Sequence, residues 1–150
     1  MDIFTGDASK LSDRQTGLFA VGLSYPKDVL AIIRSRRPLP QDFHRNAAGH
    51  ILQLTRATMK SLFPGDEPSV EEASYSYPFR YNVAMYCMNL FWTATGNVTA
   101  APPKKVRNDA MDMTYVAYAS FFDGVITEDS KLSAAYDLTV DFLTRVFNLR

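Results

Sequence analysis

The stretch from Phe79 to Ala94 constrains the fold more than any other part of the sequence. Its apolar residues recur at helical spacing, and the remaining positions are also largely apolar. The residues at this spacing are Phe79, Val83, Tyr86, Cys87, Leu90, Phe91 and Ala94. A helix that is apolar on every side has no face to turn toward water. We therefore expect this helix at the centre of the core, with Gly96 and Asn97 ending it.

Other helices are predicted on both sides of this segment. Between Asp42 and Phe63 apolar residues recur every three or four positions, which predicts a long amphipathic helix. Pro26 suits the first turn of a shorter helix that ends before Pro38. The predicted helices span about residues 9–23, 26–37, 42–63, 79–94, 109–122 and 130–146, with one helical turn at 70–73 and a linker at 97–105.

The length and composition are those of one folded domain. The chain has 150 residues, of which 47% are apolar, and a chain of this size buries roughly 68–70% of the surface that it exposes when unfolded. The net charge is zero but unevenly distributed. Seven basic residues lie between Lys27 and Lys60, whereas seven acids and only Lys131 as a base lie between Asp109 and Asp141. The first region suits phosphates and the second suits cations.

The single cysteine, Cys87, excludes an internal disulfide, and its apolar neighbours indicate a buried, inert thiol. A reducing compartment follows, so we predict a cytoplasmic protein. No charged start followed by a long apolar run is found at the N-terminus, and no apolar run is long enough to span a bilayer. We expect no membrane partner, and the sequence gives no oligomeric state.

One short run changes the period of the pattern. Val125 to Thr127 is β-branched and lies between Gly124 and a polar cluster, which predicts a buried strand. A helix before it and a helix after it fit a parallel arrangement. The predicted fold class is therefore α/β, strongly helix-rich, with a small parallel sheet; an all-α bundle is the alternative.

Acidic residues gather around this strand. Asp109 and Asp112 lie three residues apart, so they share a face in the first turn of the predicted helix, and Asp129 follows the strand. Open α/β sheets bind ligands at the carboxyl ends of their strands. Carboxylates held close together resist shared ionisation unless a cation neutralises them, and Mg²⁺ or Mn²⁺ prefers oxygen ligands. Such an ion supports phosphodiester hydrolysis.

This order of parts resembles the C-terminal half of a PIN-like nuclease domain. The matching stretches are "DMTYVAYASFF", which opens with Asp112, and "GVITED", which leads to Thr127 and Asp129. The resemblance implies a partial three-layer α/β/α unit over residues 104–150, after a helical part over residues 1–100. It also implies metal-dependent cleavage of RNA, with Asp112 and Asp129 holding Mg²⁺ or Mn²⁺, the Thr127 hydroxyl orienting the site and Asp109 assisting.

The sequence departs from the family pattern near its start. Members open with an apolar strand that ends in an aspartate, whereas "MDIFTGDASK" places only Ile3 and Phe4 between Asp2 and Asp7. Glu71 and Glu72 are the candidates for the acid on an early helix. The predicted function is a PIN-like metal-dependent ribonuclease, or a fragment or inactive relative of one.

The alternative is a non-catalytic helical module that binds a protein partner. Acids in the first turn of a helix are also ordinary capping residues, and Asp129 is well placed to begin the last helix. Arg34, Arg36 and Arg37 are predicted to contact the RNA backbone, or else to form solvated helix surface. Alternating aromatic residues are candidates for base stacking or for packing a loop against the core: Tyr75, Tyr77, Phe79 and Tyr81.

Overall fold

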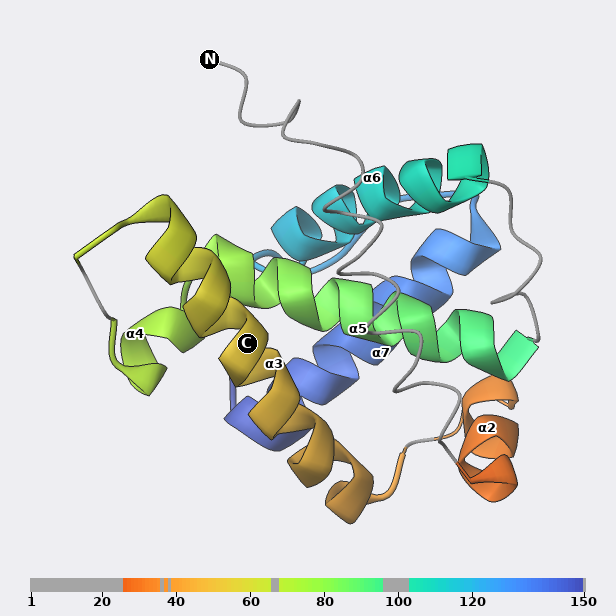
Figure 1. Cartoon of the computed structure of the whole chain (residues 1–150). Helices are drawn as coiled ribbons and strands as arrows, with labels where there is room; N and C mark the ends of the chain where they lie inside the picture. Colours follow the sequence, from red (N-terminus) through yellow and green to blue (C-terminus); the bar gives the residue numbers. More distant parts are fainter. Residues whose placement is uncertain (1–25, 36, 38, 66–67, 96–102, 150) are drawn as a thin grey trace.

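A computed structural model describes residues 26–35, 37, 39–65, 68–95 and 103–149. These residues form six helices, labelled as in Figure 1: α2 (Lys27–Arg34), α3 (Gln41–Leu62), α4 (Val70–Ser74), α5 (Tyr77–Thr95), α6 (Pro103–Ala119) and α7 (Ser130–Phe147). The predicted helix over residues 9–23 lies outside the described residues. None of the helices described is long and apolar enough to cross a membrane.

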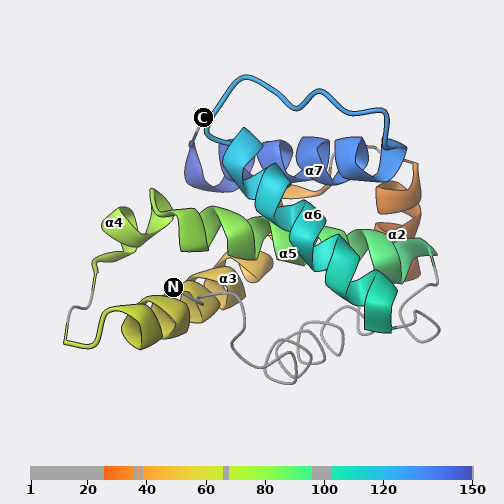
Figure 2. The ribbon, with the colours of Figure 1, turned by 90° about the horizontal axis from the view of Figure 1, so that it is seen from above.

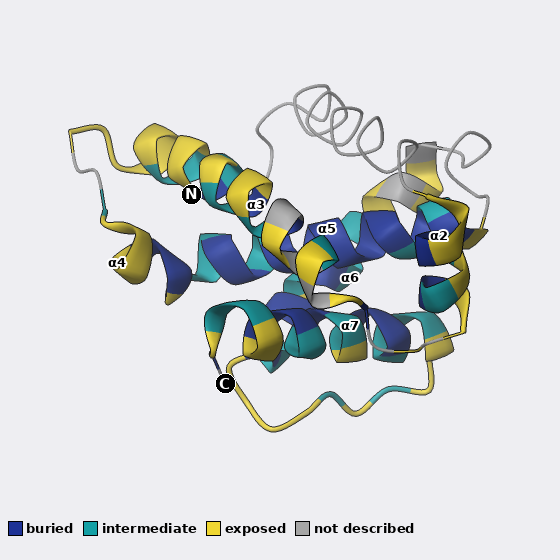
Figure 3. Cartoon of the chain, turned by 90° about the horizontal axis from the view of Figure 1, so that it is seen from below, coloured by how far each residue is buried: buried dark blue, intermediate teal, exposed yellow. Residues whose placement is uncertain are grey.

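The central position predicted for α5 is confirmed. It contacts α2, α3, α4, α6 and α7, and Figures 1 and 2 show the other helices arranged around it. Most of its residues are buried, which Figure 3 shows as dark blue along the helix. Cys87 is fully buried, and this burial raises the pKa of its thiol to about 12, as expected for an inert cysteine.

The buried side chains divide into two clusters on different sides of α5. The first core joins α2, α3, α5 and α7 and consists mainly of branched and aromatic residues. It includes Ile33, Ile51, Phe79, Leu90 and Phe142. The second core joins α5, α6 and α7 and consists of Ala84, Met85, Met88, Trp92, Met113, Val116 and Ala135. α6 and α7 therefore pack on the same central helix as the earlier elements.

The helix ends follow local rules. Pro103 occupies the first position of α6, where its missing N–H costs no hydrogen bond. The end of the predicted linker, residues 103–105, is therefore helical. α7 ends at Asn148, which adopts a left-handed conformation with φ of 53°, and the Leu149 N–H donates to the Leu143 carbonyl at 3.2 Å.

The predicted α/β architecture is wrong. Residues 123–129 form an irregular connection, and the described residues contain no strand. Ile126 is fully exposed, so this run is not a buried strand. A strand needs another strand to pair its backbone N–H and C=O groups, and the elements around this run are all helical. The parallel sheet and the three-layer α/β/α unit are therefore not found in the described part of the chain, which forms the alternative, an all-α bundle.

Candidate functional site

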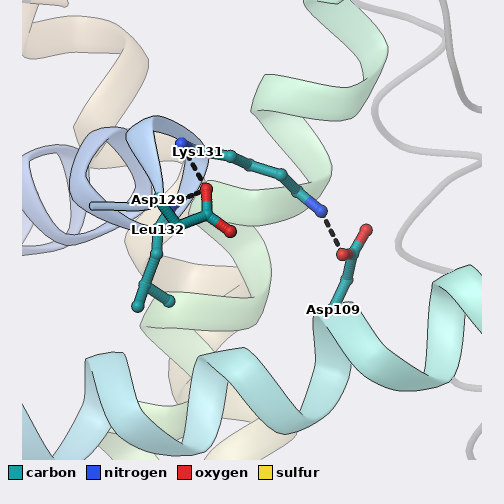
Figure 4. Close-up of polar contacts among 4 residues, drawn as sticks. All are labelled: Asp109, Asp129, Lys131 and Leu132. Carbon is teal, nitrogen blue, oxygen red and sulfur yellow. Dashed lines mark hydrogen bonds and ion pairs between the residues drawn. The ribbon is translucent and has the colours of Figure 1, made fainter. Parts of the chain in front are cut away.

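Asp129 is the N-cap of α7. Its Oδ1 accepts hydrogen bonds from the backbone N–H groups of Lys131 at 2.8 Å and Leu132 at 3.2 Å, as Figure 4 shows. Its own backbone N–H donates to the Thr127 hydroxyl oxygen at 3.1 Å. A carboxylate in this position accepts hydrogen bonds from N–H groups that have no partner within the helix. Its negative charge is also attracted to the positive end of the helix dipole. Asp129 and Thr127 therefore shape the start of a helix.

Asp109 forms an ion pair with the side chain of Lys131. It lies on α6, is 6% exposed, and accepts through Oδ1 from Lys131 Nζ, which reaches across from α7 (Figure 4). Its other oxygen, Oδ2, is buried and receives no hydrogen bond from the residues that the structure describes. A buried carboxylate is costly without a counter-charge, so Lys131 makes the burial of Asp109 tolerable.

Trp92 closes this site on the side of α5. Its ring is 3% exposed. Lys131 Nζ lies 5.4 Å from the ring centroid, and Lys105 Nζ lies 5.8 Å from it. Both distances fall within the range in which an ammonium group is attracted to the face of an aromatic ring, up to about 6 Å. Lys131 is thus held between a carboxylate and an indole.

Asp112 is partly buried and interacts electrostatically with Asp109, Lys131 and Asp129. Partial burial raises the pKa of its carboxyl above the usual value, the negative charges of Asp109 and Asp129 raise it further, and Lys131 lowers it. The structure therefore brings the three predicted carboxylates near one another, with Lys131 as a cation among them. α6 and α7 carry these acids without a sheet, and their joint role in binding a metal stays a prediction.

Two of the three predicted ligands have other partners in the described residues. In the described residues no group of three or more His, Cys, Asp or Glu side chains is placed to hold one. Lys131 already neutralises Asp109, and Oδ1 of Asp129 is used by the cap of α7. The Mg²⁺ or Mn²⁺ site stays a prediction, and the observed cation at this place is an ammonium group.

The predicted RNA-contacting arginines lie at and after the end of α2. Arg34 is exposed, and its Nε donates to the Leu30 carbonyl at 3.3 Å. Arg37 is also exposed and donates from Nε to the Ser35 hydroxyl at 2.9 Å. Arg36 lies outside the described residues. These contacts fix the direction of two guanidinium groups at the surface, and their role in RNA binding stays a prediction.

Other candidates have structural roles. Glu72 completes a capping box with Ser69 at the start of α4, and hydrogen bonds from the Ser69 backbone and side chain lower the pKa of its carboxyl. Phe79 is fully buried in the first core, whereas Tyr75 is 62% exposed. Tyr77 and Tyr81 are partly buried and stacked, with ring centroids 6.2 Å apart. These aromatic residues do not form one exposed stacking surface.

Exposed residues on α6 and in the turn after it form a surface that the sequence pattern did not predict. We call it the α6 face: Met111 (60% exposed), Tyr115 (63%), Tyr118 (57%) and Phe122 (72%). The opposite side of α6 buries Asp109, Met113, Val116, Ala117 and Ser120. The helical spacing of the large residues was visible in the sequence, but both sides of α6 are apolar. Spacing alone therefore does not show which side meets the core.

Comparison of the chain with protein-family models, with curated proteins and with solved structures gives no significant match. The functional interpretation therefore depends on the residues of this chain alone.

Proposed function

We propose that this chain is a helical protein-interaction module that binds a protein partner through the α6 face. The observation that carries this proposal is the exposure of four large apolar residues, three along one side of α6 and Phe122 in the turn after it. Since a large aromatic side chain presents about 150–250 Å², the four together expose on the order of 500 Å². Phe121 and Ile126, which follow α6 in the sequence, are also exposed, at 41% and 105%.

An exposed apolar area of this size lies in the range of the largest patches found on monomeric proteins. The largest apolar patch on a monomeric protein is about 300–600 Å² and is often functional. Tyrosine, phenylalanine and methionine are also the residue types enriched at the centres of protein interfaces. The composition of the α6 face is therefore that of an interface centre.

One residue of the α6 face, Tyr118, is held in place by a contact with α5. The Tyr118 ring packs against the Tyr77 ring of α5, with centroids 4.7 Å apart. Tyr77 is itself partly buried, which raises the pKa of its hydroxyl, and it shares a hydrogen bond with Thr114. An aromatic residue held in place before binding loses less conformational freedom when a partner arrives, so Tyr118 is suited to be an anchor.

Site-specific crosslinking tests this function. Tyr115 would be replaced by the photoreactive residue p-benzoylphenylalanine in the full chain, and Gln53, an exposed residue of α3, would be replaced in a matched control. We expect illumination in cells to link position 115 to a protein that mass spectrometry identifies, and position 53 to give no comparable product. Absence of a product at position 115 above the control would reject the proposal.

Metal-dependent cleavage of RNA is a second candidate. It is favoured by the charges around Asp112: burial raises the pKa of its carboxyl most, and Asp109 and Asp129, the other two predicted ligands, are near enough to raise it further. In this case Arg34, Arg36 and Arg37 are the candidates for contacts with RNA phosphates. The PIN-like resemblance then concerns the order of the acids along the chain and not a sheet. The cytoplasmic location expected from the single cysteine fits either function and is part of both proposals.

A manganese titration with an RNA substrate tests this candidate. The full chain would be compared with Asp112→Asn and Asp129→Asn. Asparagine caps a helix about as well as aspartate, so the second variant removes the charge and keeps the start of α7. We expect both substitutions to abolish manganese-dependent cleavage if the acids act on RNA. No cleavage by the full chain, or equal cleavage by all three proteins, would rule it out.

A further inference from the structure

We infer that the partner of the α6 face is a second copy of this chain, bound antiparallel about a two-fold axis near Tyr115. The inference rests on the proposed function and names its partner. It comes from the distribution of charge and of apolar area along one helix.

The charge along α6 changes sign from one end of the α6 face to the other. Lys104 and Arg107 are exposed near its start, and Asp123 is exposed just after it, where hydrogen-bonded turns continue the chain beyond Ala119. The four residues of the α6 face lie between these ends. Helical spacing places Lys104, Arg107 and Met111 on one side of α6.

This pattern is complementary to itself when one copy is reversed. Tyr115 lies eight residues from Arg107 and eight residues from Asp123, which follows the end of α6 at Ala119. In an antiparallel pair centred on Tyr115, the basic start of α6 in each copy, with Arg107, lies toward the turn after α6 in the other copy, with Asp123, and the two Tyr115 side chains meet at the axis. A two-fold interface uses the same surface on both copies, so each favourable contact occurs twice. A parallel pair would instead place the basic ends together.

The apolar area is of the size that such a pair needs. Homodimer interfaces are about 65% apolar. An apolar centre on the order of 500 Å² therefore corresponds to a whole interface of roughly 800 Å² on each copy, the size of a standard stable interface. The charged residues at both ends of the α6 face then form its polar rim.

Sedimentation velocity of the full chain over a wide range of concentration tests the stoichiometry. We expect a reversible dimer that Tyr115→Lys converts into a monomer, because two ammonium groups would meet at the axis. Phe63→Lys is the matched control, since Phe63 is 54% exposed and directly follows α3, which packs on α4, α5 and α7. This variant should remain dimeric, and circular dichroism should show that both variants are folded.

A charge exchange tests the orientation. Arg107→Glu and Asp123→Arg should each weaken the dimer about tenfold, because each single change replaces two attractive pairs with two repulsive ones. The double variant restores both pairs and should return to within about threefold of the original affinity. Weakening without restoration would reject the antiparallel arrangement.

The remaining outcomes separate this inference from the proposed function. A monomeric chain whose position 115 crosslinks to a different protein would reject the second copy and keep the interaction module. A monomeric chain with no crosslink would reject both. A dimer that Tyr115→Lys leaves unchanged would place the interface elsewhere and reject the inference.

Discussion

The two cores on either side of α5 are built differently. The first core is packed with branched and aromatic residues such as Ile51, Phe79 and Phe142. The second core relies on alanine, methionine and Trp92, and it is bordered by the Asp109–Lys131 ion pair. Branched and aromatic side chains fill a defined shape, whereas methionine adapts to irregular space. The first core is therefore suited to specify the fold, and the second combines packing with charge.

Truncation in the first core should have the largest effect. Phe142 is fully buried there, so Phe142→Ala should lower the free energy of unfolding by about 3–5 kcal/mol, through lost burial and a residual cavity. Met113→Leu in the second core preserves volume and should cost less than about 1.5 kcal/mol. Urea denaturation of both variants measures the difference. A loss from Met113→Leu as large as that from Phe142→Ala would show that the second core also requires one side-chain shape.

Removal of Lys131 should rank next. Lys131→Met keeps most of the side-chain volume but leaves Asp109, which is 6% exposed, without its counter-charge. Because the Lys131 side chain is 25% exposed, water offsets part of this penalty. We expect a loss of about 2–3 kcal/mol in urea denaturation, below the roughly 3–5 kcal/mol of a fully buried pair.

A double variant provides the control for this experiment. Lys131→Met combined with Asp109→Leu removes both charges, so it should be more stable than Lys131→Met alone. A double variant with the summed loss of the two single variants would show that the pair does not couple, and that the second core tolerates an isolated carboxylate.

The helix cap beside this pair should have a smaller effect. Asp129→Ala removes the acceptor for the N–H groups of Lys131 and Leu132 and should cost about 1 kcal/mol, whereas Asp129→Asn should cost a few tenths at most. Thermal denaturation of the two variants checks the order. If Asp129→Asn lost as much stability as Asp129→Ala, the charge of Asp129, and not its hydrogen bonds, would be what stabilises the start of α7.

The parts of the fold that local pattern controls were predictable from the sequence. A segment that is apolar on all sides can only be central, so the position of α5 and the burial of Cys87 followed directly. The start of α7 at Ser130 also followed, since Asp129 is a good cap under either interpretation. The strand at residues 125–127 failed because a β-branched run becomes a strand only where another strand is available to pair with it.

Contacts between distant residues were not predictable. Lys131 and Asp109 are 22 residues apart, and nothing local marks them as partners. Arg80 is 3% exposed and donates to the Ser120 carbonyl just after α6, while its guanidinium lies 4.1 Å from the centroid of the Phe121 ring. The contact of Arg80, on α5, with the end of α6 depends on how these two helices cross. Asp109, one of the acids that suggested a metal site, thus has a partner that only the tertiary structure shows.

The pH dependence of stability should show the smallest effect and reports on the acids around the second core. Burial, with Asp109 and Asp129, raises the pKa of Asp112 in the folded state above its ordinary value of 3.8. Between the unfolded and folded pKa values the folded state holds the proton more tightly. The contribution of Asp112 to stability is therefore most favourable at low pH and declines as pH rises through that window.

Asp112→Asn removes this titration. The free energy of unfolding of the variant minus that of the original chain should be larger at neutral pH than at acid pH. This difference should develop as the pH rises above 3.8. Denaturation of both proteins across this range checks the sign, and Asp42→Asn on the exposed start of α3 is a control without these neighbours. A difference that grows toward acid pH instead would mean that Asp112 is stabilised as an anion, which would place a cation closer to it than Asp109 and Asp129 are. That cation would be Lys131, whose charge would then outweigh burial and the two neighbouring acids.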